Sequence, residues 1–308
     1  MRKLGQSLAI VWLAASALVG TQAPAPDAAA GVLAATREAL GGEKKLSGVK
    51  TVVATGRTRQ VRGDNLVPIE FEIAIELPDK YMRRDEIPAQ ESGPTISGFN
   101  GDTLLQFPPP GPPPARAGGP PPPTAEQMAA SARMRLGAVK QDFARLMLGL
   151  FAASSSAYPL TFTYAGKAEA PQGKADVLDV KGPAGPGALA ARLFVNAETH
   201  LPIMVSWTAA SPSPRGSAGA TAPQAREGAP PPLPAGSAGP PPARAGGPPS
   251  QPSSPESRLY FGEYREAGGL QLPFRLRLAL GTDTIEETTF DGFKINPKID
   301  PKKFEVRR

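Results

Sequence analysis

The sequence predicts a mainly β fold, in which a curved antiparallel sheet forms an open half-barrel and two helices cover its concave side. The first observation is the stretch from Ile69 to Leu77, where apolar residues alternate with three glutamates and an alanine. This two-residue period is typical of a strand with one apolar and one solvated face. The second observation is the same alternation from Phe274 to Leu280, near the other end of the chain.

Strand-like stretches recur along the chain and are separated by turn signals such as Asn100-Gly101 and Gly268-Gly269, which indicates consecutive hairpins. They span residues 51–61, 67–77, 80–87, 95–99, 103–107, 160–167, 174–180, 190–196, 203–209, 258–266, 271–280 and 284–295. About a dozen strands make a sheet over roughly 50 Å wide, whereas two helices cover roughly 20 Å. We therefore expect the sheet to curl and to leave an apolar hollow, with a fully packed interior as the alternative.

Two helices are expected. The first follows Asp27, a good N-cap residue, and ends at Gly41-Gly42. The second begins at Thr124, with Gln127 in capping-box spacing, and carries an apolar stripe that continues to Leu150. Packing against the core is the simplest interpretation of this stripe. The alternative is that Met134, Met147 and Phe151 contact a ligand.

Residues 1–25 are expected to be a signal peptide, because Arg2 and Lys3 precede an apolar run that is too short to span a bilayer. The alternative is an uncleaved signal that anchors the chain. Residues 26–308 are expected to form one domain, interrupted by disordered proline-rich insertions at 108–123 and 211–256. The segment GPPPARAGGPP occurs at 111–121 and again at 239–249. This repeat is either duplicated low-complexity sequence or a motif that binds one partner twice.

Composition argues against several classes of protein. The formal net charge of +6 is mild and dispersed, so nucleic acid is not expected as a partner. The absence of cysteine excludes disulfides, thiolate metal sites and a lipid-modified cysteine anchor, so the mature protein should be soluble. His200 is the single histidine, and Ser47 and Lys50 have acyl-enzyme spacing without a companion motif. We therefore expect no catalytic residues, no metal and no cofactor.

Several phrases, taken in order, resemble the outer-membrane lipoprotein carrier and sorting superfamily, the LolA/LolB-like fold. They are EALGGE at 38–43, LPDKY at 77–81, GFNGD at 98–102, NAETHLP at 196–202 and GGLQLPF at 268–274. The resemblance implies an unclosed β-barrel with helices as a lid, which holds acyl chains in the bacterial periplasm without catalysis. In that family an arginine directly after the aromatic residue of the second phrase ties the lid to the barrel, but Met82 occupies this position here.

The expected function is thus periplasmic binding or carriage of lipid or lipoprotein acyl chains, by a monomer that contacts membranes transiently. The candidate cavity lining is Ile69, Phe71, Ile73, Ile75, Met82, Phe143, Leu146, Leu150, Phe274, Leu276 and Leu278. Arg84 is the candidate lid contact, because strand alternation places it on the same face as Met82; surface positions for Arg83 and Arg84 are the alternative. The alternative function is an interaction or sensor module that uses its proline-rich arms to bind envelope proteins.

Overall fold

The computed structural model describes residues 26–88, 90, 93–110, 123–170, 173–185, 188–208 and 255–305. The expected signal peptide, most of both proline-rich insertions and both copies of the repeated segment lie outside these residues.

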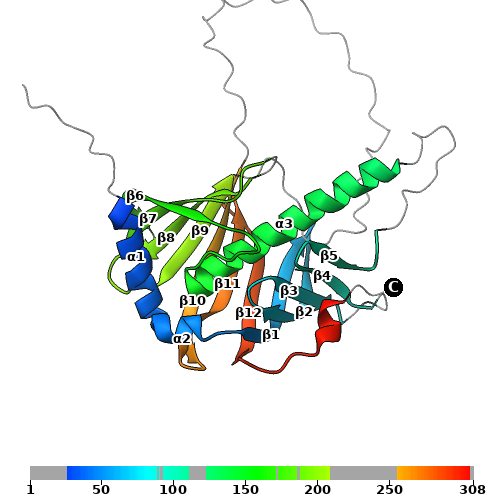
Figure 1. The fold of residues 1–308 in the computed structure, drawn as a ribbon, viewed down its shortest axis with the longest axis horizontal. Coiled ribbons are helices and arrows are strands. Elements are labelled where there is room, and N and C mark those ends of the chain that lie inside the picture. Colours follow the sequence, from blue (N-terminus) through cyan, green and yellow to red (C-terminus); the bar gives the residue numbers. More distant parts are fainter. Residues whose placement is uncertain are drawn as a thin grey trace, which may run out of the picture.

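Within the described ranges the fold is mainly β: one antiparallel sheet of twelve strands that does not close, together with three α-helices (Figure 1). The helices are α1 (Pro26–Ala39), α2 (Glu43–Ser47) and α3 (Ala125–Phe151), and a short 3-10 helix, η1, spans Pro301–Phe304. The strands are β1 (Thr51–Arg62), β2 (Asn65–Glu76), β3 (Lys80–Glu86), β4 (Thr95–Asn100), β5 (Thr103–Phe107), β6 (Thr161–Ala170), β7 (Gly173–Lys181), β8 (Ala190–Asn196), β9 (Pro202–Thr208), β10 (Glu256–Ala267), β11 (Leu270–Leu280) and β12 (Asp283–Ile295).

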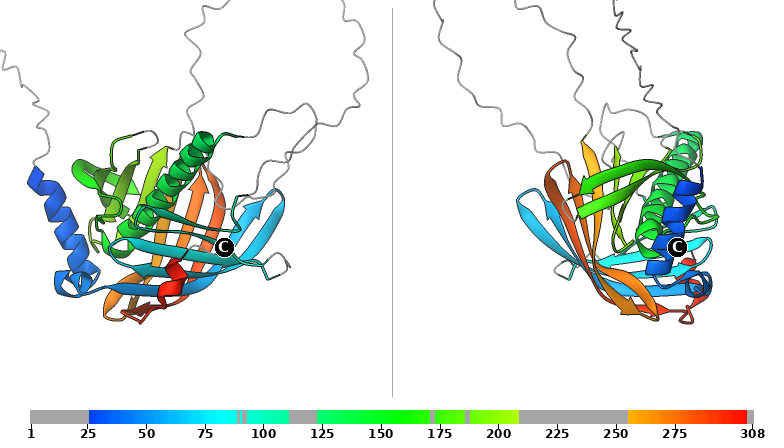
Figure 2. Two further views of the ribbon diagram at one scale, coloured as in Figure 1. Left: turned by 45° about the vertical axis from the view of Figure 1, so that its right-hand side comes forward. Right: turned by 90° about the vertical axis from the view of Figure 1, so that its left-hand side faces the viewer.

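The chain builds the sheet from its centre in two halves. Strands β1 to β5 run in sequence from the centre to one edge, and β6 to β12 return from the opposite edge. The halves join where β12 pairs with β1, with Val52 opposite Ile295. Helix α3 connects the two edges and lies across the concave side of the curved sheet (Figure 2). The mainly β fold class that the alternating pattern predicts is confirmed.

The helices differ in part from the expectation. The capping box of α3 is present, because Thr124 Oγ1 accepts a hydrogen bond from the Gln127 amide and Gln127 Oε1 accepts one from the Thr124 amide. Helix α1 lies beside β6 at the sheet edge, so α3 is the helix that crosses the concave face (Figure 1). Helix α2 was not predicted, since five residues are too few to display a helical period.

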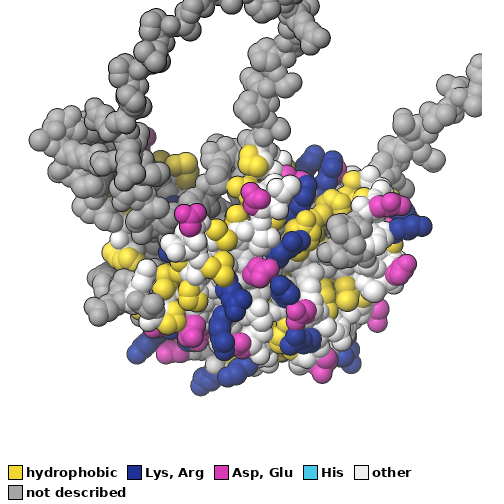
Figure 3. Space-filling view, turned by 180° about the vertical axis from the view of Figure 1, so that it is seen from behind, with side chains coloured by type: hydrophobic (Ala, Val, Ile, Leu, Met, Phe, Trp, Pro, Cys, Tyr) yellow, Lys and Arg dark blue, Asp and Glu magenta, His cyan; other side chains and the backbone are white. Residues whose placement is uncertain are grey.

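The two faces of the sheet bury different clusters. The concave cluster contains residues from all three helices and from both halves of the sheet. A smaller cluster on the convex side consists of Ala74, Met82, Ile96, Leu105 and Phe304. The C-terminal segment covers this second cluster, where Lys303 pairs with Glu72. Elsewhere the convex face shows basic and acidic side chains interspersed (Figure 3).

Candidate functional site: the covered concavity

Helix α3 fits closely into the concave face. Its side chain Phe143 is fully buried and contacts the rings of Tyr81 and Phe99, with centroid distances of 5.4 Å and 5.3 Å. Near the C-terminal end of α3, Gly149 lies against the buried ring of Phe261. A Cβ atom on residue 149 would lie only 2.5 Å from Phe261 Cζ. The absence of a side chain at residue 149 therefore allows α3 to approach β10 this closely.

Polar contacts fix α3 to the surrounding elements at several points. Lys140 Nζ lies 2.7 Å from Asp102 Oδ1 in the β4–β5 turn, and this hydrogen bond lowers the pKa of Asp102. The Tyr264 hydroxyl donates to the carbonyl oxygens of Gly149, at 3.3 Å, and Pro202, at 3.0 Å. Burial raises the pKa of Tyr264 well above its ordinary value, so this phenol stays protonated and able to donate.

The C-terminal end of α3 is also held by α1. Arg37 Nη1 donates to the Phe151 carbonyl oxygen at 2.9 Å, where a cation is favoured by the helix dipole. The same guanidinium binds both carboxylate oxygens of Glu43, and this hydrogen bonding lowers the pKa of Glu43. Both ends of the buried half of α3 are thus fixed, one to the sheet and one to α1.

A hollow of about 20 Å³ remains between α3 and the sheet. Its lining residues are Ile73, Tyr81, Arg83, Asp142, Leu146, Leu259, Leu276, Leu278, Glu286, Thr288 and Phe290. This volume is enough for about one water molecule and far too small for an acyl chain. The expectation of an open apolar hollow is therefore wrong for this conformation, because the large side chains of α3 and the aromatic rings of the sheet fill the concavity.

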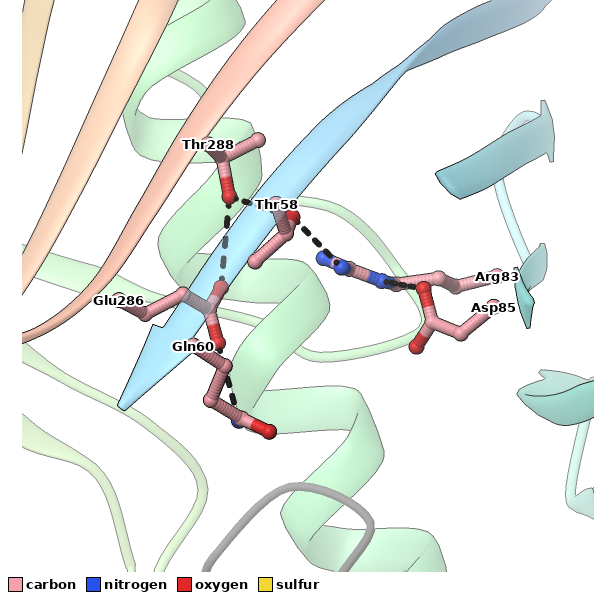
Figure 4. Close-up of polar contacts among 6 residues, drawn as sticks. All are labelled: Thr58, Gln60, Arg83, Asp85, Glu286 and Thr288. Atoms are coloured by element: carbon pink, nitrogen blue, oxygen red, sulfur yellow. Dashed lines mark hydrogen bonds and ion pairs between the residues drawn. The ribbon is translucent and has the colours of Figure 1, made fainter. Parts of the chain in front are cut away.

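One wall of the concavity is polar. Arg83 Nε lies 2.7 Å from Asp85 Oδ1, and Arg83 Nη2 donates to Thr58 Oγ1 at 3.2 Å. The hydroxyls of Thr58 and Thr288 lie 2.8 Å apart. Glu286 accepts hydrogen bonds of 3.4 Å from Thr288 and from Gln60, which extends the chain of contacts across β3, β1 and β12 (Figure 4). We call these six residues the inner polar wall.

Helix α3 presents charge to the same region. Asp142 lines the hollow together with Arg83 and Glu286, and Arg145 pairs with Asp142 at 2.9 Å. The Arg145 guanidinium also lies 4.1 Å from the ring centroid of Trp207 on β9, a cation–π contact. The contact surface between α3 and the sheet is therefore apolar along most of its length and charged at one side.

Most predicted lining residues face the concavity. Phe71, Ile73, Ile75, Phe143, Leu146, Leu150, Phe274 and Leu276 belong to the concave cluster, and Leu278 packs against it. Ile69 is buried on the same face of β2, two residues before Phe71. Whether any of these residues contacts a ligand stays a prediction.

Two predicted residues lie on the opposite side. Met82 belongs to the convex cluster, and Arg84 is partly exposed beside Glu86, with Nη2 2.8 Å from the carboxylate. The expectation assigned the wrong face of β3: Tyr81 pairs with Ile75 and Arg83 with Ile73, so Tyr81 and Arg83 point inwards. Arg83 is the inward arginine, and it also covers the ring of Phe71 at 4.7 Å.

Sequence reasoning missed the inner polar wall and the paired charges of α3. The opposite charges of Glu76 and Lys80, which flank the turn, fit the observed register and could have placed Tyr81 and Arg83 inside. Thr58 and Gln60 follow the alternation of β1 from Val52, yet a threonine or glutamine gives no apolar signal. Glu286 and Thr288 on β12 are polar too, so the apolar alternation did not identify them as inward-facing residues.

Among the described residues no group of three or more histidine or acidic side chains could hold a metal ion. Nor does the described part of the chain contain a helix long and apolar enough to cross a membrane.

Comparison with solved structures finds a similar arrangement in bacterial proteins. A LolA superfamily protein from Nitrosomonas europaea has a TM-score of 0.47 and 11% identity, over 90% of this chain and 97% of the other. An outer membrane lipoprotein-sorting protein domain from Vibrio parahaemolyticus has a TM-score of 0.46 and 7% identity, over 91% and 97%. A DUF1329 family protein from Desulfovibrio piger has a TM-score of 0.44 and 7% identity, over 90% and 97%.

No protein-family model matches the sequence, and no curated protein matches it. Two of the structures named above, a LolA superfamily protein and a lipoprotein-sorting domain, bear names of the superfamily that the sequence phrases resemble. At these identities and TM-scores the likeness concerns general architecture and says nothing about the ligand.

Proposed function

We propose that this protein binds lipid, or the acyl chains of lipoproteins, against the concave wall of its sheet. It does so without catalysis, in the bacterial periplasm, as a monomer that contacts membranes transiently. The observation that supports the proposal is an unclosed sheet whose inner face is lined by Leu, Ile and Phe side chains and covered by one helix, α3. Because α3 fills the concavity, the ligand enters only when α3 moves outwards.

The energy of this exchange indicates the kind of ligand. An acyl chain gains about 0.8 kcal/mol for each methylene that it buries, which gives roughly 12 kcal/mol for a sixteen-carbon chain. Helix α3 buries Phe143, Leu146, Met147, Leu148, Leu150 and Phe151. Exposing such side chains costs about 1.5–3 kcal/mol each, so displacing all six costs at most roughly 9–18 kcal/mol. The gain from one chain lies within this range of costs, whereas the gain from two chains, roughly 24 kcal/mol, exceeds the whole range.

A cross-linking experiment tests whether α3 must move. The chain contains no cysteine, so an introduced pair is the only target of a short bis-maleimide. The variant Asp102→Cys/Lys140→Cys places the pair where the two native side chains meet at 2.7 Å, between the β4–β5 turn and α3. We expect this variant to take up a fluorescent diacyl lipid before cross-linking and to lose uptake afterwards.

The matched control joins two elements on the convex face. Glu72→Cys/Lys303→Cys replaces the ion pair between β2 and η1, away from α3. Cross-linking this control should leave lipid uptake unchanged. Equal uptake by the α3 variant before and after cross-linking would show that lipid does not enter beneath α3.

Native mass spectrometry of protein purified from bacterial membranes provides an independent test. Recovered phospholipid or acylated peptide supports carriage. A lipid-free protein that instead retains an unacylated polypeptide favours the alternative, an envelope interaction module.

A further inference from the structure

The side of α3 that lines the hollow continues past it toward the N-terminal end of the helix. Asp142 and Leu146 are the residues of α3 that line the hollow. Val139 and Arg135 precede them at spacings of three and four residues, which places all of them on one side of the helix. At about 1.5 Å per residue, Arg135 lies roughly 10 Å along the helix axis from Asp142. This side of α3 therefore carries a guanidinium group just beyond the hollow.

Arg135 lies at the boundary between the buried half of α3 and the half that projects beyond the sheet (Figure 1). Residues 124–130 are exposed, residues 143–151 are buried, and Arg135 is half-buried between them. A lipid whose chains lie against the sheet beneath α3 places its headgroup at such a boundary, because a polar headgroup is costly to remove from water.

The guanidinium group of Arg135 lacks an acceptor. Its Nε is buried without a hydrogen-bond partner, and no ion pair joins Arg135 to another residue in the described part of the chain. Buried donors are almost always paired in native structures, so an exception requires an explanation. Leaving a donor unpaired costs more when the group is charged. A ligand group that accepts hydrogen bonds and carries negative charge would supply what the described residues do not.

The surrounding part of α3 is positively charged. From Gln127 to Val139 the helix contains two arginines and no acidic residue. Arg133 is the other arginine, and two residues of separation place it on a different side of the helix from Arg135. There its Nε donates to the carbonyl oxygen of Ala129, one turn earlier, at 3.4 Å. This stretch attracts anions, and Arg135 is its arginine on the side that lines the hollow.

We propose that the preferred ligand is an anionic phospholipid, whose phosphate binds Arg135 while its acyl chains lie on the apolar concave wall. The planar set of donors on a guanidinium group matches two oxygens of a phosphate. This inference rests on the proposed function, because it assumes that lipid enters beneath α3. It favours phospholipid over an acylated polypeptide, since acyl chains attached to a polypeptide bring no phosphate to Arg135.

Competition between matched lipids tests the inference. Vesicles with equal amounts of phosphatidylglycerol and diacylglycerol, of identical acyl chains, are incubated with the full chain, and bound lipid is quantified by mass spectrometry. We expect phosphatidylglycerol to be preferred about tenfold or more, which corresponds to about 1.4 kcal/mol. Equal uptake of the two lipids by the wild-type protein overturns this inference alone, whereas uptake of neither lipid overturns the proposed function as well.

Two variants assign the preference to one side chain. Arg135→Gln removes the charge on the side of α3 that lines the hollow, so the preference should fall to near one. Arg133→Gln removes the same charge two residues away, on a different side of the helix, and should keep the preference. An unchanged preference in Arg135→Gln that is folded by circular dichroism overturns the inference. An equal loss in both variants also overturns it, because it indicates a general attraction of anions to α3.

Two further arms identify the source of the phosphate. Inorganic phosphate in large molar excess over lipid should leave the uptake of phosphatidylglycerol unchanged, because the acyl chains hold the lipid in place. Loss of the preference in its presence would assign Arg135 to free phosphate and overturn the assignment to lipid. A diacylated lipopeptide with the same chains should be taken up about tenfold less than phosphatidylglycerol. Equal or greater uptake of the lipopeptide contradicts the choice of phospholipid.

Discussion

Substituting Gly149 by alanine tests directly how α3 is seated on the sheet. The new methyl group would lie 2.5 Å from Phe261 Cζ and closer still to two other ring atoms. Carbon atoms in favourable contact lie about 3.5–4.0 Å apart, so α3 or the buried ring must shift by about 1 Å or more. Overpacking of this kind costs about 1–3 kcal/mol.

Gly137 provides a matched control in the same helix, because a Cβ at that position has no neighbour within 4 Å. Alanine is favoured over glycine in a helix by about 1 kcal/mol, and this gain applies to both substitutions. We therefore expect Gly137→Ala to stabilise the protein by about 1 kcal/mol and Gly149→Ala to be about 1–3 kcal/mol less stable than Gly137→Ala.

Urea unfolding followed by circular dichroism measures both free energies. A diacyl fluorescent probe, added under native conditions, measures how readily α3 gives access to the concave wall. Gly149→Ala should take up more probe than Gly137→Ala at equal protein concentration. Equal unfolding free energies for the two variants would refute the close contact between α3 and β10.

Further predictions concern individual polar contacts. Replacing Arg83 by methionine should destabilise the protein by about 1–3 kcal/mol, because Asp85 loses its contact with the guanidinium and Thr58 loses one of its two hydrogen bonds. Arg84→Met should change stability by less than about 0.5 kcal/mol, and thermal unfolding compares the two variants. Tyr264→Phe should cost about 1–2 kcal/mol in urea unfolding at neutral pH. The folded-state pKa of Tyr264 is raised, so its contribution to the free energy of unfolding is complete below the ordinary pKa of 10.0 and is lost as the pH rises from there through the folded-state pKa. The difference in unfolding free energy between wild type and Tyr264→Phe should therefore narrow in alkali. Asp102→Asn should speed amide hydrogen exchange in α3 near neutral pH. Because the pKa of Asp102 is lowered, the exchange rates of wild type and variant should become equal as the pH falls below 3.8 and through the folded-state pKa.

The strands were predictable because their signal is local. Every strand begins within two residues of a stretch that alternation and turn residues predict, as β2 and β11 show, and every strand except β6 ends within one residue of it. Strand β6 continues to Ala170, three residues beyond its predicted end. The capping box of α3 was predictable for the same reason, since Thr124 and Gln127 lie three residues apart. Such patterns depend only on neighbours in sequence.

The contents of the concavity were less predictable, because they depend on contacts between distant segments. The expected hollow followed from comparing the width of the sheet with the width of two helices. That comparison left out the volumes of side chains such as Phe143 and Phe99, which fill the space between helix and sheet. The face assigned to Met82 was wrong because Tyr81 and Met82 are both apolar enough to be buried, and both are buried, on opposite sides. The hydroxyls of Thr58 and Thr288 form a hydrogen bond although the two residues are 230 positions apart in the sequence, and no local sequence pattern predicts such a pair.

The join between β1 and β12 has a consequence for how this chain folds. Each half of the sheet is a succession of hairpins between neighbouring segments, whereas the seam pairs Val52 with Ile295. Contacts between such distant residues form late, since the entropy of closing the intervening loop is lost before the contact is gained. We expect the hairpins to appear first and the seam to set the overall folding rate, so that a nascent chain exposes the edge of β1 until the final strand has been synthesised.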